Sequence, residues 1–159
     1  MATLHFVFGR PGAGKTSLAR ALAAELPALL FCEDEWLAAL GGTITTVDEY
    51  VAASRRVRSL IAPTATRVLE LGTSVVLDFA GNTVRDRAWV RTILDAARAD
   101  HALHVLDVPV EECRRRLHAR NALQPPGLFF GHVSDALFDG VLPHIVPPSP
   151  HEGFDLVAH

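Results

Sequence analysis

The sequence is poor in the residues that build disulfide frameworks and metal centres. Its 159 residues include only two cysteines, Cys32 and Cys113, and these form no metal-binding or redox spacing. Such sparse use of cysteine suits a reducing compartment, so the sequence predicts a cytoplasmic protein. The eight histidines show no paired ligand spacing either, and we expect them to be structural or exposed.

Long apolar runs and an excess of positive charge are also missing. No run approaches the ~20 residues of a membrane-spanning helix. The apolar N-terminus lacks the basic region of a signal peptide and is interrupted at Gly9 after a few residues. The net charge of −3 disfavours a nucleic-acid partner, although a local basic face would still allow one. Nothing in the sequence indicates an oligomeric state.

What is present is typical of one globular domain. Hydrophobic residues make up 49% of the chain and charged residues 21%, and there is no internal repeat. A chain of this length buries a core of its own, so we expect a single domain over residues 1–159.

The most informative stretch is the segment from Gly9 to Thr16. It reads Gly9-Arg10-Pro11-Gly12-Ala13-Gly14-Lys15-Thr16 and fits G-x-x-x-x-G-K-[ST] at every fixed position. An apolar run over 4–8 precedes it, and strong helix formers begin at Ser17, which is the context of a phosphate-binding loop. Backbone N–H groups of the loop and the start of the helix would surround a nucleotide's phosphates. Lys15 would reach the β- and γ-phosphates, and the Thr16 hydroxyl would help to hold Mg²⁺.

Carboxylates follow two further apolar segments. The acidic cluster Glu33-Asp34-Glu35 comes after the run over 29–32, and Asp78 closes the run over 73–79. In open α/β sheets the working groups lie beyond the carboxyl ends of strands. Asp78 matches the Walker B aspartate that orients Mg²⁺. The simpler alternatives are an acidic helix start for the cluster and a turn residue for Asp78.

Two groups of arginines stand out. Arg116 and Arg120, within the basic run 114–120, are four residues apart and so share one side of a predicted helix. The second group, Arg55, Arg56 and Arg58, is typical of a solvated helix face, and the alternative is a contact to an anionic substrate.

The alternation of segments predicts the fold. We expect five strands, over 4–8, 29–32, 73–79, 101–108 and 154–158, separated by helices, which gives a parallel three-layer α/β/α sandwich. Capping boxes at Thr46 and Thr83 predict two helix starts. Pro63 is expected to end or restart the first of these helices. Right-handed crossovers would place the functional loops on one rim of the sheet.

With these residues the chain resembles the small bacterial P-loop kinase-like ATP-binding proteins, a group related to chloramphenicol phosphotransferase, zeta toxins and polynucleotide kinases. The resemblance runs through the whole chain, including Gly9–Thr16, the acidic cluster, 75–79, 104–109, 116–121 and 147–154. It implies the strand order 2-3-1-4-5 and a short lid-like region at about 114–131.

The resemblance also implies roles for individual residues. Asp34 corresponds to the general base of the related kinases, and Glu33 and Glu35 are the alternatives, because a register shift of one residue would change which carboxylate points inward. Arg116 and Arg120 correspond to the arginine pair of their lid helix, with Arg116 over adenine and Arg120 reaching the transferring phosphate. The resemblance names no acceptor.

Three functions therefore remain open. The first is an Mg-ATP-dependent kinase that phosphorylates a hydroxyl of a small molecule, with Asp34, Lys15 and Arg120 as catalytic residues. The second is an ATP-binding regulator or ATPase without a dedicated acceptor. The third is a GTPase-like switch, favoured by the D-x-x-G pattern of Asp78 to Gly81 but not by strand four, whose end Asp107-Val108-Pro109 lacks the guanine-reading N-K-x-D.

Overall fold

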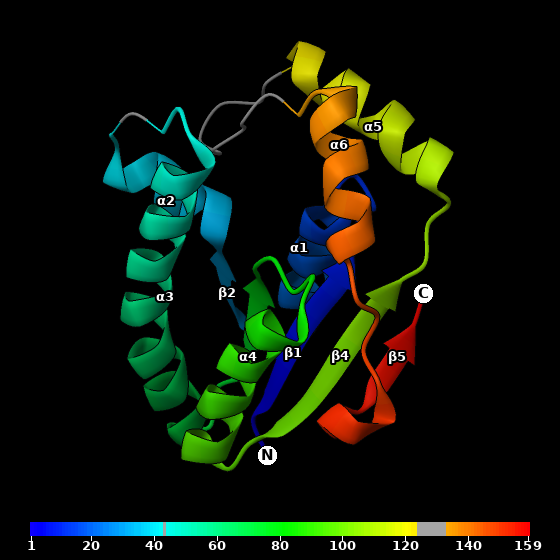
Figure 1. Cartoon of the computed structure of the whole chain (residues 1–159). Coiled ribbons are helices and arrows are strands. Elements are labelled where there is room, and N and C mark those ends of the chain that lie inside the picture. Colours follow the sequence, from blue (N-terminus) through cyan, green and yellow to red (C-terminus); the bar gives the residue numbers. More distant parts are fainter. Residues whose placement is uncertain (43, 124–132) are drawn as a thin grey trace.

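The computed structural model describes residues 1–42, 44–123 and 133–159, and its centre is a five-stranded parallel sheet (Figure 1). The strand order is β2-β3-β1-β4-β5, which confirms the expected fold class and topology. The strands are β1 (Thr3–Gly9), β2 (Leu29–Cys32), β3 (Val75–Asp78), β4 (Asp100–Leu106) and β5 (Leu156–Ala158). The α-helices are α1 (Lys15–Glu25), α2 (Glu33–Leu40), α3 (Val47–Glu70), α4 (Val84–Ala97), α5 (Val110–Leu123) and α6 (Asp135–Val141), and the 3₁₀ turns are η1 (Leu142–His144) and η2 (Pro150–Glu152).

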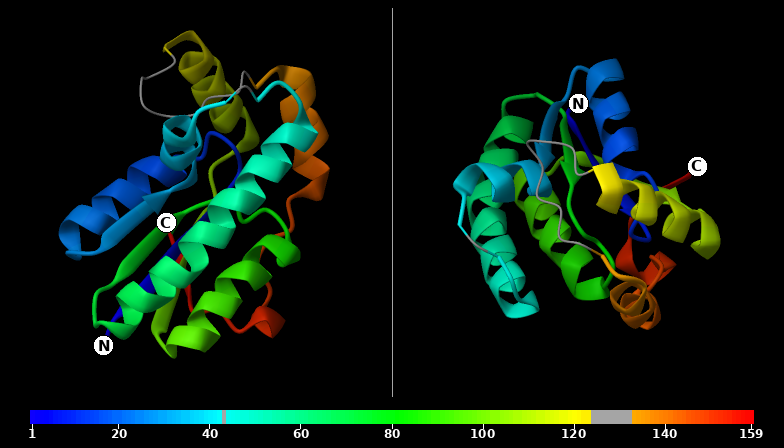
Figure 2. Two further views of the ribbon diagram at one scale, coloured as in Figure 1. Left: turned by 90° about the vertical axis from the view of Figure 1, so that its left-hand side faces the viewer. Right: turned by 90° about the horizontal axis from the view of Figure 1, so that it is seen from above.

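Helices cover both faces of the sheet. Alternate residues of β1 point to opposite sides, so Phe6 enters the large core and Val7 enters a smaller one. The large core is completed by α3 and α4, for example through Ile61 and Ile93, and the smaller one by α1 through Ala19. Both turned views in Figure 2 show this layering. Because the strands are parallel, the loops that follow them meet at one rim.

The prediction for Pro63 was wrong, because α3 runs without a break from Val47 to Glu70. Residues on both sides of the proline, including Val57, Ile61 and Ala65, are completely buried. Pro63 itself is exposed, so water can satisfy the carbonyl that its ring leaves without an N–H partner. Tertiary packing of the buried stripe therefore outweighs the local cost of the proline. Both predicted capping boxes, at Thr46 and Thr83, are confirmed.

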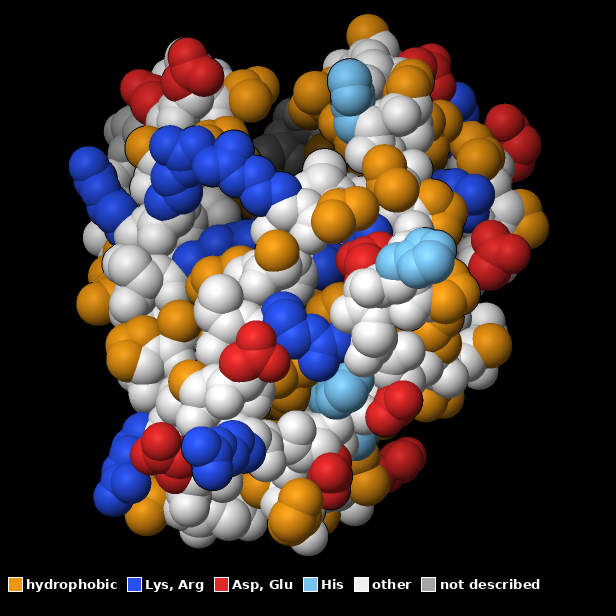
Figure 3. All heavy atoms as spheres, turned by 60° about the horizontal axis from the view of Figure 1, so that its bottom comes forward, with side chains coloured by type: hydrophobic (Ala, Val, Ile, Leu, Met, Phe, Trp, Pro, Cys, Tyr) orange, Lys and Arg blue, Asp and Glu red, His pale blue; other side chains and the backbone are white. Residues whose placement is uncertain are grey.

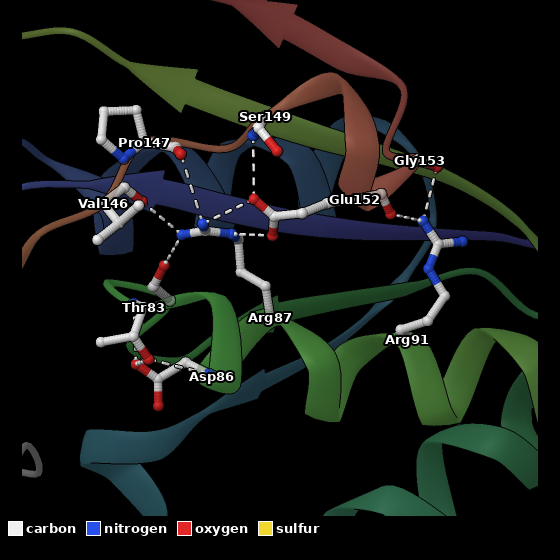
Figure 4. Close-up of polar contacts among 10 residues, drawn as sticks. Thr83, Asp86, Arg87, Arg91, Val146, Pro147, Ser149, Glu152 and Gly153 are labelled. Carbon is white, nitrogen blue, oxygen red and sulfur yellow. Dashed lines mark hydrogen bonds and ion pairs between the residues drawn. The ribbon is translucent and has the colours of Figure 1, made fainter.

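A buried ion pair fixes the C-terminal segment to α4 (Figure 4). The Arg87 guanidinium of α4 is fully buried and donates to both carboxylate oxygens of Glu152, at 2.7 and 2.9 Å. It also donates to the carbonyls of Gly81 and Val146, each at 2.8 Å. A buried guanidinium needs such a full set of acceptors. Arg87 thereby joins the loop after β3 to the segment that leads from α6 to β5.

Candidate active site

The phosphate loop connects β1 to α1 and packs directly against α5. Gly12 and Gly14 have φ angles of 81° and 98°, which side chains rarely adopt. A Cβ on Gly12 would also collide with the backbone carbonyl of Cys113 in α5. Ala13 is buried in a cluster with Cys113, Leu117 and Phe138. These glycines therefore permit both the turn of the loop and its contact with α5.

Lys15, the only lysine of the sequence, folds back over this loop. Its ammonium group donates to the carbonyls of Gly9 and Arg10 at 3.0 and 3.1 Å. Burial lowers the pKa of Lys15, and the nearby Asp78 carboxylate opposes this shift. The ammonium group is thus held at the strand-to-helix junction, where the phosphates of a nucleotide are expected.

Asp78 and Thr16 meet beside the loop. The Thr16 hydroxyl donates to Asp78 Oδ2 at 2.7 Å, and the Cys32 thiol donates to the same oxygen at 3.3 Å. Burial, followed by the charge of Asp78, raises the pKa of Cys32 to about 12, so the thiol stays protonated as a donor. Hydroxyl and carboxylate oxygens are the ligands that Mg²⁺ prefers, so this pair fits the ion that the motif implies. In the described ranges no three His, Cys, Asp or Glu side chains form a metal cluster.

The three carboxylates of the acidic cluster have different surroundings. Glu33 is buried, accepts a hydrogen bond from the Ser54 hydroxyl and lies 3.9 Å from the Arg58 guanidinium. Glu35 is on the surface and pairs with Arg20 at 3.1 Å. Glu33 and Glu35 thus each bind partners other than the phosphate loop. Asp34 is half-buried and interacts electrostatically with Asp78, Lys15 and Arg120. It is therefore the cluster member directed toward the phosphate loop.

The environment of Asp34 favours its protonated form. Burial is the main cause, and the carboxylates of Asp78 and Glu33 add to it, raising the pKa of Asp34 to about 7. The positive charges of Arg120 and Lys15 act in the opposite direction. A carboxylate with a pKa near neutrality can both accept and release a proton under physiological conditions.

The arginines of α5 separate into two groups. Arg116 donates to the Ala13 carbonyl in the phosphate loop at 3.1 Å and to Glu112 at 2.8 Å. Arg120 is lowered in pKa by burial, and the charge of Asp34 opposes this shift. Arg114 points the other way and holds α6 through Asp135 and Asp139, at 2.9 and 2.6 Å.

Arg116 and Arg120, the pair singled out by the i, i+4 spacing, thus interact with the phosphate loop and with Asp34, and their roles toward a nucleotide stay predictions. Arg115 is largely exposed, and its pairing is to Glu112 on its own helix. The described part of the expected lid-like region is helical as far as Leu123, and residues 124–131 lie outside the described residues.

Sequence reasoning missed three residues that support the site. Cys32 pairs in register with Asp78 across β2 and β3, so its position at a strand end was the available signal. Ser54 and Arg58 lie one turn apart on α3 and both contact Glu33. Because α3 is distant in sequence from the acidic cluster, no local pattern pointed to this contact.

The sequence of the chain matches a known protein family. A family model described as AAA domain matches residues 4–126. The chain belongs to this AAA domain family, AAA_33. The match spans the phosphate loop, the acidic cluster, Asp78 and the arginines of α5. No protein of curated function matches the chain in sequence.

Several solved structures share the fold of this AAA-domain chain. A candidate kinase from Chloroflexus aurantiacus superposes with a TM-score of 0.79 at 22% identity, covering 99% of this chain and 86% of that one. A sugar kinase from Janibacter sp. gives 0.66 at 17% identity, covering 100% and 85%. The APS kinase CysC of Mycobacterium tuberculosis, solved with AMPPNP and APS, gives 0.54 at 20% identity, covering 80% and 78%. At these identities the likeness establishes the shared fold.

One face of the molecule carries basic side chains on one side. In Figure 3, Lys and Arg side chains gather toward the side of α3, and histidines lie toward α6 and the C-terminal segment. Among the helices described for this AAA-domain chain, none is both long and apolar enough to span a bilayer.

Proposed function

We propose that this protein is an ATP-dependent phosphotransferase that moves the γ-phosphate of Mg-ATP to a hydroxyl group of a small molecule. The observation that carries the proposal is the position of Asp34. Its carboxylate lies within electrostatic reach of Lys15, Asp78 and Arg120, and its pKa is raised to about 7. A phosphate loop alone would support nucleotide binding only, whereas a half-buried carboxylate beside it adds a group suited to proton transfer.

The phosphate loop and the first turn of α1 would bind the triphosphate. The loop backbone and the N-terminus of α1 offer N–H donors, and Lys15 would exchange its carbonyl acceptors for phosphate oxygens. Thr16 and Asp78 would hold Mg²⁺, which neutralises phosphate charge when it is bound. Ser17, exposed directly after Thr16, completes the predicted binding stretch.

Asp34 would act on the acceptor. An alcohol hydroxyl has a pKa far above neutrality, so its attack on phosphorus benefits from a carboxylate that orients it and takes its proton. Arg120, which interacts electrostatically with Asp34, would stabilise charge on the transferring phosphate. Arg116 donates to the phosphate loop itself and would therefore contact the nucleotide, not the acceptor.

The D-x-x-G pattern gains a packing explanation that weakens the GTPase interpretation. A Cβ on Gly81 would lie 2.7 Å from the Phe6 ring, and the Gly81 carbonyl accepts from Arg87. Glycine is therefore required there by the core, independently of any γ-phosphate sensing.

The test is acceptor profiling with γ-labelled ATP, using the wild-type protein and Asp34→Asn in parallel. We expect label to appear on a hydroxyl compound with the wild type. The rate should fall by about 10²–10⁴ in the variant, the usual worth of a general base. Mg-ATP affinity should stay within a few-fold. Tight ATP binding with only slow hydrolysis across a broad panel would instead indicate an ATPase or a regulatory protein. A clear preference for GTP would indicate a switch.

A further inference from the structure

Arg58 contacts three elements around the candidate site at once. From α3, its guanidinium donates to the Ala80 carbonyl at 2.8 Å, two residues after Asp78. It lies 3.9 Å from Glu33 at the start of α2 and 3.5 Å from Asp86 at the start of α4. All three distances involve different nitrogens, so the planar fork of the guanidinium is shared among the three partners.

Aromatic rings hold this guanidinium in place. Its central carbon lies 4.9 Å from the Trp89 ring centroid and 5.9 Å from that of Phe79. Only 14% of the Arg58 side chain is exposed, whereas its neighbours Arg55 and Arg56 are exposed. The interpretation of the three arginines as one solvated basic face therefore fails for Arg58. Its charge is engaged within the protein, which also argues against a role in holding an anionic substrate.

The partners of Arg58 adjoin the two carboxylates of the proposed mechanism. Glu33 immediately precedes Asp34, and Ala80 follows Asp78 by two residues. The helix α2 and the loop after β3 are otherwise separate elements, each following its own strand. Asp86 forms the capping box of α4 with Thr83, so the third contact fixes Arg58 to the loop's far end.

We infer that Arg58 is a positioning residue, which sets the base Asp34 at a fixed place relative to Asp78 and the phosphate loop. This inference rests on the proposed function for its catalytic consequence. The physical reason is that phosphoryl transfer depends on geometry, and displacements of about 1 Å can cost 10²-fold in rate. The contact between Arg58 and Glu33 also neutralises the buried charge of Glu33. The experiment must separate this effect from the positioning of Asp34.

The experiment compares Arg58→Met with Arg55→Met, a control that makes the same substitution at an exposed position of the same helix. Hydrogen exchange of the folded proteins is measured first, since it needs no acceptor. We expect exchange at least fivefold faster in Arg58→Met over 33–37 and 80–83, with residues 9–16 unchanged. Arg55→Met should match the wild type. Equal exchange in both variants would overturn the inference, and if Arg58→Met does not fold, Arg58→Lys replaces it, because lysine keeps the charge without the fork.

Turnover and nucleotide binding then separate positioning from general stability. In Arg58→Met the ATP dissociation constant should change less than threefold, while kcat falls at least tenfold. Turnover is measured on the acceptor found by profiling, or on ATP hydrolysis if none is found. Arg58→Lys should recover only part of kcat. A lower melting temperature with kcat unchanged would mean a purely structural role and would also overturn the inference.

The double variant Arg58→Met with Glu33→Gln distinguishes bridging from neutralisation. If Arg58 only compensates the buried charge of Glu33, removing that charge should restore kcat and the slow exchange. A bridging role predicts that both defects persist in the double variant. Should the wild type neither bind nor turn over ATP, the proposed function would fail, while the exchange measurements would still decide whether Arg58 joins the two elements.

Discussion

The Thr16 hydroxyl and the Asp78 carboxylate, 62 positions apart in the chain, are joined by a 2.7 Å hydrogen bond. This bond links the first turn of α1 to the end of β3 and brings together the two oxygen atoms that are proposed to hold Mg²⁺. We expect Thr16→Val to raise the Mg²⁺ concentration needed for half-maximal turnover at least about tenfold. Removing a residue that only hydrogen-bonds a metal ligand commonly lowers metal affinity by about this factor. Magnesium titration at fixed ATP measures this. Thr64→Val on the exposed side of α3 is the control, and an equal response of both variants would contradict the assignment.

Lys15→Ala should weaken ATP binding. The substitution removes a charge-assisted contact worth about 1.5–3 kcal/mol, which corresponds to roughly 10- to 100-fold in affinity. Calorimetric titration with ATP measures the change. Arg20→Ala, one turn further along α1 and exposed, removes a positive charge outside the loop and should leave affinity unchanged. An unaltered dissociation constant in folded Lys15→Ala would refute the phosphate-loop assignment.

The pH dependence of turnover should report Asp34. Only the ionised carboxylate can take the proton from the hydroxyl that is phosphorylated, and the pKa of Asp34 is raised to about 7. Turnover at saturating substrates is therefore expected to rise as pH increases through 7 and then to level off. The inflection should be absent from the residual activity of Asp34→Asn. A profile that is flat from pH 6 to 8 in the wild type would contradict a base with this pKa.

The same carboxylate should lower the stability of the protein at neutral pH. The folded-state pKa, about 7, lies above the unfolded value, so the folded protein disfavours the ionised form. The free energy of unfolding should therefore fall as pH rises from the unfolded pKa through 7. Asp34→Asn should be the more stable protein at pH 8, by on the order of 1–3 kcal/mol, and lose this advantage near pH 4. Denaturant unfolding at both pH values tests this, and a destabilised variant at pH 8 would refute it.

Arg120→Ala is expected to lower turnover more than ATP binding. Charge on the transferring phosphate is stabilised most in the transition state, so kcat should fall about 10- to 100-fold with a few-fold change in affinity. The matched control is Arg115→Ala on the same helix, whose side chain is 72% exposed and pairs with Glu112. Equal kcat values for the two variants would show that α5 does not direct Arg120 at the reaction.

The sequence predicted the elements whose signals are local. The phosphate loop, the capping boxes and the apolar strand runs each occupy a few consecutive residues. The alternation of these segments predicted a parallel sheet, and the resemblance to a known family predicted the order of its strands. The resemblance singled out Asp34 within the acidic cluster, and its role as the base stays a prediction. Contacts between distant segments were not predictable. The continuity of α3 through Pro63 depends on packing against the sheet, and the place of Arg58 depends on Ala80 and Asp86, which no pattern near Arg58 reveals.

The single lysine has a practical consequence for studying this protein. Every other basic side chain among the 15 Lys and Arg residues is a guanidinium, which amine-directed reagents leave untouched at neutral pH. Besides the α-amino group, an acylating or aldehyde probe therefore has one target, and that target lies in the phosphate loop. A nucleotide bound as proposed should slow the modification of Lys15, so compounds can be ranked as ligands by this slowing before an acceptor is known.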